Sequence, residues 1–215
     1  MTEIKQIVCG MVNCYLLTGK EGAVLVDTGE RGYEEKVFKE CEHKNVRLLV
    51  LTHGHIDHIQ NAAYLARRLE VPIAIHKRDV ELTQNQFAQA MTGRGLFGKV
   101  LEAASKNKMR KNRIENFEPG IFLKEGDILE QFGIQASVLE LPGHTEGSIG
   151  LDVDGRAVIV GDALMHMLLP GMAGIYSDKR KLQESAERIG GLGSRMIYFG
   201  HGKPLENRKW IKKPS

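Results

Sequence analysis

A dense group of metal-ligand side chains follows one apolar stretch of this sequence. His53, His55, Asp57 and His58 lie within six consecutive positions, one residue after the apolar residues 48–51. An apolar run of this kind is typical of a strand that is buried on both faces of a sheet. In an extended loop His53 and His55 point in the same direction. Asp57 and His58 belong to the following turn and can reach a second ion. Neutral imidazole and carboxylate are ligands that zinc, iron and manganese accept, so we expect a metal-binding loop at the end of a central strand.

Three further candidate ligands lie far along the chain, because a single loop cannot complete two metal sites. They are His144, Asp162 and His201. Each follows an apolar run that is typical of a strand, and each has a glycine directly before it. Loops at strand ends are where a rigid sheet holds catalytic groups against each other. We therefore expect five histidines and two aspartates to act together.

The remaining pattern predicts an α/β protein. Short β-rich runs alternate with helical segments, and their order indicates a sandwich built from two similar halves. The expected helices span residues 33–43, 59–69 and 178–189. The expected strands span residues 6–8, 14–17, 23–27, 48–51, 73–75, 121–123, 128–132, 134–140, 149–153, 157–160 and 196–199.

Residues 77–118 differ in composition from the rest of the chain. They contain few β-branched residues and many helix formers, interrupted by Gly93, Gly95 and Gly98. We interpret them as two or three helices that form a cap or insertion within a single domain spanning residues 1–215.

Composition argues against several classes of protein. The net charge of +3 is too small to indicate nucleic acid. No apolar run approaches the roughly 20 residues of a membrane helix, and the polar N-terminus lacks an apolar signal core. Cys9, Cys14 and Cys41 form no Cys-x-x-Cys pair and indicate reduced thiols. We expect a cytoplasmic protein that binds neither nucleic acid nor membrane; its oligomeric state, homo-oligomer included, is left open.

The excess positive charge lies in two segments. One is residues 99–113, and the other is the C-terminal tail with Arg208, Lys209, Lys212 and Lys213. The first segment is either a solvated helix face or a rim that attracts an anionic substrate.

The ligand pattern resembles that of the metallo-β-lactamase superfamily, and residues 27–29 resemble the early turn of that family. The resemblance covers residues 5–205 and implies a four-layer αββα sandwich with the active site along one edge of its two sheets. It also implies two ligand sets joined by one bridging residue. The first metal would be bound by His53, His55 and His144, the second by Asp57, His58 and His201, and both by Asp162.

The same resemblance implies a chemistry. Two divalent ions about 3.5–4 Å apart, zinc or else iron or manganese, share a water and lower its pKa to about 7. The bridging hydroxide then attacks a carbonyl or phosphoryl centre, and Asp57 is expected to orient it. His166 is a candidate donor to the substrate, or else a histidine packed beside Met165 and Met167.

Short thioesterases of the glyoxalase II type match the motifs best, since residues 52–58 and 143–147 look like theirs. Met165 stands where the acyl-homoserine lactonases have a tyrosine. We expect a hydroxyacylglutathione hydrolase-like enzyme that cleaves a small, anionic thioester or ester. Lactonase and phosphodiesterase activity stay open, as do a mono-iron, persulfide dioxygenase-like oxidoreductase and a non-catalytic regulator that binds a ligand.

The specificity pocket is expected at residues 87–117 and 168–176. Several apolar side chains there are candidates to line a pocket or to fill a core. They are Met91, Leu96, Phe97, Met109, Met165, Met167 and Met172.

Overall fold

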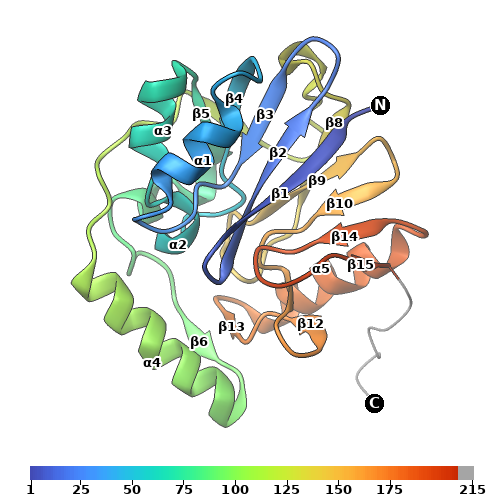
Figure 1. Cartoon of the computed structure of the whole chain (residues 1–215). Coiled ribbons are helices and arrows are strands. Elements are labelled where there is room, and N and C mark those ends of the chain that lie inside the picture. The colour runs from blue at the N-terminus through green and yellow to red at the C-terminus, as the bar shows by residue number, and fades with distance from the viewer. Residues whose placement is uncertain (208–215) are drawn as a thin grey trace.

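Two β-sheets that face each other form the centre of the protein, with helices outside each sheet (Figure 1). The structure is a computed structural model that describes residues 1–207, except for the side chain of Phe97. The N-terminal sheet has six strands, in the spatial order β1 (Glu3–Cys9), β2 (Val12–Thr18), β3 (Ala23–Val26), β4 (Val46–Val50), β5 (Ile73–His76) and β7 (Ile121–Leu123).

The C-terminal sheet has five strands and is accompanied by two short ribbons. Its spatial order is β15 (Leu205–Glu206), β14 (Met196–Tyr198), β10 (Ala157–Ile159), β9 (Ile149–Val153) and β8 (Ala136–Glu140). The ribbons pair β11 (Leu164–His166) with β12 (Pro170–Met172), and β6 (Thr92–Gly93) with β13 (Ile175–Tyr176).

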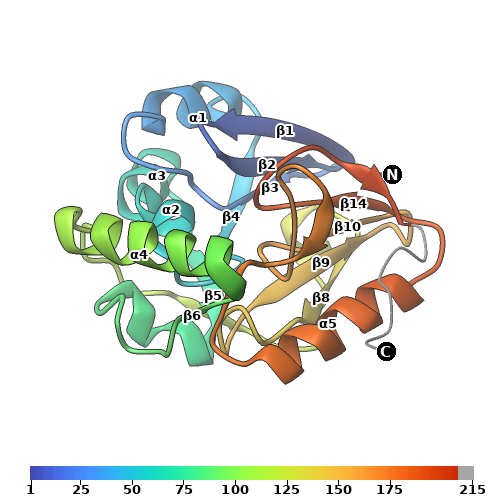
Figure 2. The same cartoon turned by 90° about the horizontal axis from the view of Figure 1, so that it is seen from below.

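The helices lie outside the sheets (Figures 1 and 2). The α-helices are α1 (Glu34–Cys41), α2 (Ile56–Ile59), α3 (Ala62–Leu69), α4 (Gly95–Lys111) and α5 (Lys179–Gly191). Three short 3-10 helices are η1 (Lys77–Asp79), η2 (Glu81–Thr83) and η3 (Glu130–Phe132). Among the described residues, none of the helices has the length and hydropathy that a membrane span requires.

Three layers of buried apolar side chains confirm the αββα sandwich. Successive residues of a strand point to opposite faces, and in β3 Val24 and Val26 face the other sheet whereas Leu25 faces α1 and α3. Both faces of this strand are covered, which is why its sequence is continuously apolar. On the far side of the C-terminal sheet, α5 contributes Leu182 and Ile189 to a third layer.

Strand directions bring several loops to one edge of the sandwich. β4 runs parallel to β3 and β5, and β10 runs parallel to β14. β8 has the same direction as β10, because both pair antiparallel with β9. The two sheets are joined at this edge, where the amide of Ile149 donates to the carbonyl of Thr52 at 2.8 Å. The loops that leave β4, β8, β10 and β14 therefore converge.

The strand predicted at 128–132 is wrong. Residues 130–132 form η3 instead, and Gly133 ends it in the left-handed region with φ +89°. Leu129 is buried, whereas Ile128 is 56% exposed. A single buried side chain in a turn explains the apolar residues that suggested a strand.

The helix predicted at 59–69 is divided into α2 and α3. Asn61 stands at the break, and its side-chain amide donates to the carbonyls of Thr28 and Glu30 at 3.0 and 2.7 Å. These bonds hold the turn after β3 against the start of α3, which a continuous helix would not do.

Residues 77–118 contain one long helix, α4, besides η1 and η2. Gly95 and Gly98 lie in its first turn and do not interrupt it. Gly98 is needed for close packing, because a Cβ there would lie 2.6 Å from the carbonyl oxygen of Gly174. Figure 2 shows α4 lying across the edge of the sandwich near α2.

Candidate metal centre

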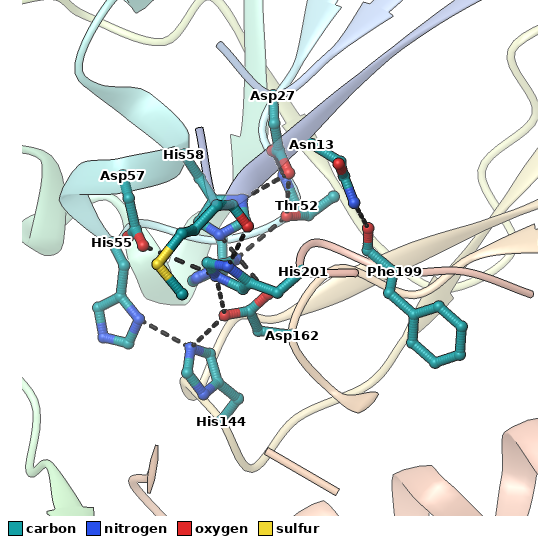
Figure 3. A network of polar contacts seen from close by, with 12 residues as sticks. Asn13, Asp27, Thr52, His55, Asp57, His58, His144, Asp162, Phe199 and His201 are labelled. Atoms are coloured by element: carbon teal, nitrogen blue, oxygen red, sulfur yellow. Dashed lines mark hydrogen bonds and ion pairs between the residues drawn. The ribbon is translucent and has the colours of Figure 1, made fainter. Parts of the chain in front are cut away.

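The structure brings all seven predicted ligands together at the edge where the loops converge. Figure 3 labels six of them, all except His53. They lie after four different strands or in the short helix that follows β4. His53 and His55 follow β4, Asp57 and His58 lie in α2, and His144, Asp162 and His201 follow β8, β10 and β14.

Three groups of ligand atoms can be recognised among the described residues. Within each group the atoms lie within 4.8 Å of one another, which is close enough to share an ion. The groups are His53 with His55 and His144; His53 with His58 and Asp162; and Asp57 with His58 and His201.

Two of the histidines are held by backbone carbonyls. His144 donates through Nδ1 to the carbonyl of Ile175 at 2.9 Å, and His201 donates through Nδ1 to the carbonyl of Met11 at 2.8 Å. A carbonyl only accepts, so the proton stays on Nδ1 and Nε2 keeps its lone pair. Such anchoring sets the orientation of metal-binding imidazoles.

A carboxylate anchors two more histidines from behind. His58 donates through Nδ1 to Asp27 at 2.8 Å. The hydroxyl of Thr52 donates to the same carboxylate at 2.8 Å and lies 3.1 Å from Nδ1 of His53. Because the hydroxyl proton is used on Asp27, His53 donates to Thr52, and both rings are left with Nε2 for the cluster. Figure 3 shows the contacts of Asp27 with Thr52 and His58.

Buried atoms without partners show that the cluster fits a metal. Nε2 of His53, Nε2 of His58 and Oδ1 of Asp162 have no hydrogen-bond partner among the described residues. Buried polar atoms nearly always have one. Three buried ligand atoms without hydrogen-bond partners in one place are what a bound cation would satisfy.

The protonation states of His53, His55 and Asp162 also suit cation binding. Burial holds the pKa of His53 well below its ordinary value and lowers the pKa of His55 to about 3. Both rings are therefore neutral, as metal ligands must be. Burial opposes ionisation of Asp162, but His201 and His58 outweigh it and hold its pKa well below its ordinary value.

The glycines before the ligands are required by space. A Cβ at Gly200 would lie 2.1 Å from Oδ1 of Asp162. A Cβ at Gly143 would lie 2.1 Å from the amide nitrogen of Leu182, and Gly143 has φ +129°. A larger residue at either position would displace the ligand that follows it.

Asp79 is an organising residue that the sequence did not reveal. It is fully buried and accepts hydrogen bonds from the amides of Gly54 at 2.8 Å and Gly147 at 2.7 Å. It also accepts from the hydroxyl of Thr145 at 2.6 Å. One carboxylate thus joins the loop of His53 and His55 to the loop of His144. Asp79 lies three residues after β5, a strand-end position like those of the candidate ligands. This position is the sequence feature that could have identified it.

His166 lies apart from the cluster. It donates through Nδ1 to the carbonyl of Lys203 at 2.8 Å, and its ring lies 5.6 Å from that of Phe199. Residues alternate along β11, and Met165 and Met167 line the cavity beside the cluster whereas His166 does not. The placement favours the packed histidine over the candidate donor.

That cavity has a volume of about 310 Å³ and reaches the candidate ligands at one end. Of the seven side chains considered for a pocket, five line it, namely Met91, Met109, Met165, Met167 and Met172. Leu96 is 88% exposed and is not among the lining residues. The side chain of Phe97 lies outside the described part of the structure.

One basic residue of α4 faces the cavity. Nζ of Lys108 lies 2.6 Å from Oε1 of Glu30 and 3.9 Å from Oδ2 of Asp57. Lys106 pairs with Glu102 on the same helix. Segment 99–113 therefore has both a solvated face and a cation near the cluster. The tail with Arg208, Lys209, Lys212 and Lys213 lies outside the described residues.

The chain is similar in sequence to known proteins. The family model described as the metallo-beta-lactamase superfamily matches residues 7–201. The chain is 31% identical over 168 residues to hydroxyacylglutathione hydrolase GloC of Haemophilus influenzae, over 75% of this chain and 71% of that protein. It is 27% identical over 166 residues to the acyl-coenzyme A thioesterase MBLAC2 of Homo sapiens, over 71% of this chain and 58% of that protein.

A solved structure agrees in fold. The crystal structure of TTHA1623 in a di-iron-bound form matches 95% of this chain and 94% of its own, with a TM-score of 0.70 and 25% identity. The family match, the layered sheets and the histidine and aspartate cluster at their edge lead to one conclusion: this chain belongs to the metallo-β-lactamase superfamily.

Proposed function

We propose that this protein is a dinuclear metal-dependent hydrolase that cleaves thioesters. The observation that carries the proposal is a cluster of buried histidine and aspartate atoms that lack hydrogen-bond partners and lie at the end of a cavity. Two relatives that act on thioesters, a hydroxyacylglutathione hydrolase and an acyl-coenzyme A thioesterase, support the substrate class.

The geometry supports two ligand sets that share Asp162. Its Oδ1 lies 3.5 Å from Nε2 of His58, and its Oδ2 lies 3.6 Å from Nε2 of His144 and 3.2 Å from Nε2 of His201. The carboxylate thus faces rings of both sets. His53, His55 and His144 would hold one ion, and Asp57, His58 and His201 the other, with zinc, iron and manganese all compatible with these ligands.

The bound ions would activate a water for attack and polarise the carbonyl of the substrate. The chain supplies the positioning. Asp57 has a 23% exposed side chain on the cavity wall, with Oδ2 3.7 Å from Nε2 of His201. From there its carboxylate would accept a hydrogen bond from the attacking water and set its direction. Burial would raise the pKa of Asp57, but His58 and His201 outweigh burial and lower this pKa below its ordinary value. Lys108, 3.9 Å away, lowers it further by a smaller amount.

The cellular compartment is part of the same proposal. Cys9, Cys14 and Cys41 are free and buried. Free thiols fit a reducing compartment, and we place the protein in the cytoplasm.

The test is hydrolysis of a glutathione thioester and a coenzyme A thioester by protein loaded in turn with zinc, manganese and iron. Metal content is measured on the same samples. Turnover at two metals per chain supports the proposal. We expect Asp57→Ala to lower kcat/KM by about 100- to 10,000-fold, as for a positioned acid–base group.

Asp127→Ala is the matched control, since Asp127 caps a turn outside the site by accepting from the amide of Lys124. It should leave turnover unchanged. Two bound metals without thioester hydrolysis would reject the thioester and turn the search to lactones and phosphodiesters. One iron per chain in the active form would reject the dinuclear mechanism.

A further inference from the structure

The cavity beside the metal centre is apolar away from its ligand end. Six methionines from five segments line it: Met11 between β1 and β2, Met91 before β6, Met109 in α4, Met165 and Met167 in and after β11, and Met172 in β12. Methionine is flexible and polarisable, so it adapts to an apolar guest without a fixed shape. The volume of about 310 Å³ suits a small ligand.

Polar side chains are scarce on this wall. Apart from the ligand cluster, Ser105 and Lys108 are the polar side chains among the described lining residues. Lys108 is already paired with Glu30 at 2.6 Å. A hydroxyl or carboxylate placed deep in the cavity would lose its water without gaining a matched set of partners, which is unfavourable. The wall therefore selects for an apolar guest.

The apolar surface continues outward past the cavity. Leu168 and Leu169, in the turn between β11 and β12, line its mouth and are 90% and 84% exposed. Leu101 on α4 lines it as well. A chain too long for the cavity would keep apolar contact along these leucines.

We infer that the substrate carries an unbranched apolar acyl chain, which lies among the methionines while its thioester carbonyl faces the metal ligands. The inference rests on the proposed function for the identity of the reacting group. It differs from a short 2-hydroxyacyl group, for which this wall offers no hydrogen-bonding pattern.

Binding and turnover are measured separately. Binding uses non-hydrolysable S-alkyl thioethers of coenzyme A, from ethyl to decyl, by calorimetry. Turnover uses straight-chain acyl thioesters of the same thiol, from acetyl to decanoyl, with 2-hydroxyoctanoyl beside octanoyl. The thiol is constant, so differences report the chain alone. We expect both Kd and kcat/KM to improve by about threefold to fourfold per methylene up to roughly eight carbons, as burial of a methylene predicts. The 2-hydroxy compound should react at least about tenfold more slowly than octanoyl because of the unpaired hydroxyl.

A cavity-filling variant tests the location. Ser105→Phe should lower the ratio of octanoyl to acetyl kcat/KM by at least about tenfold, since overfilling a packed space is unfavourable. Ala103→Phe is the matched control on the same helix, because Ala103 is exposed and does not line the cavity. Met172→Gln, which keeps the side-chain length, should weaken binding of the decyl thioether and serves if Ser105→Phe does not fold.

The outcomes separate the two ideas. Chain-dependent binding without hydrolysis would support the inferred chamber and reject the proposed function. Hydrolysis with no gain along the series, or with 2-hydroxyoctanoyl preferred over octanoyl, would overturn the inference and keep the proposed function.

Discussion

Replacing Asp79 by asparagine tests whether one buried carboxylate organises the metal centre. Oδ1 of Asp79 accepts from the amide of Gly147 at 2.7 Å and from the side chain of Gln89 at 3.0 Å. Oδ2 accepts from the amide of Gly54 at 2.8 Å and from the hydroxyl of Thr145 at 2.6 Å. Asp79→Asn keeps the shape but turns one acceptor into a donor.

The cost follows from these four bonds. If the amide nitrogen of asparagine replaces Oδ1, it faces the N–H of Gly147. If it replaces Oδ2, it faces the N–H of Gly54. In both cases two donors face each other. One buried donor without an acceptor costs about 1–3 kcal/mol, and loss of charge from the remaining bonds costs about 1 kcal/mol more. The sum of about 2–4 kcal/mol corresponds to a fall in Tm of roughly 4–16 °C for a chain of this size. Because the loops of His53, His55 and His144 lose their link, metal affinity should fall about 10- to 100-fold.

The assay combines thermal unfolding of the metal-free protein with zinc titration against a competing chelator. Asp178→Asn is the matched control, because Asp178 caps α5 by accepting from the amide of Lys181 and asparagine caps as well as aspartate. The reasoning is refuted if Asp79→Asn unfolds at the same temperature as the parent and binds zinc as tightly.

Three further perturbations are predicted. Burial lowers the pKa of His58, but Asp162 and Asp27 outweigh burial and raise this pKa well above its ordinary value. The protonated ring therefore stabilises the metal-free fold fully below about pH 6.5. This stabilisation is lost as the pH rises through the raised pKa. Zinc must displace that proton, so the difference in Tm between zinc-loaded and metal-free protein should grow from acidic to alkaline pH; a constant difference would contradict this. Burial raises the pKa of the Cys41 thiol to about 12, so mass spectrometry should find Cys41 unmodified by a thiol reagent in native protein and modified after unfolding. Tyr15→Phe removes a 2.6 Å bond to the carbonyl of Phe199 and should cost about 0.5–1.5 kcal/mol in denaturant unfolding.

The clustering of the seven side chains could be predicted from the sequence because their signal is local. Each follows a run of apolar residues, and the strand before it is buried on both faces, as in β4. The dense spacing from His53 to His58 supplied the rest. The capacity of this edge to bind a metal depends on its histidine and aspartate side chains, and these can be read directly from the sequence.

Asp79 could not be predicted in the same way. Its partners Gly54 and Gly147 lie 25 and 68 residues away, and backbone amides leave no trace in composition. The ribbon of β11 and β12 was missed because each of its strands has only three residues, which is too short for an alternating pattern to be recognised. Tertiary contact decides both cases.

The helix α4 supplies none of the seven clustered side chains, yet it forms one wall of the cavity. Its contacts with the sandwich include the bond from the amide of Arg94 to the carbonyl of Gly174 at 2.8 Å and the ion pair of Lys108 with Glu30. The candidate ligands and this wall of the cavity therefore belong to different stretches of chain. Under the proposed function, mutations in α4 would change which substrates fit the cavity, while the candidate ligands keep their positions at the ends of four strands. A lineage with this layout can acquire new substrates by exchanging one helix, and a protein engineer can do the same.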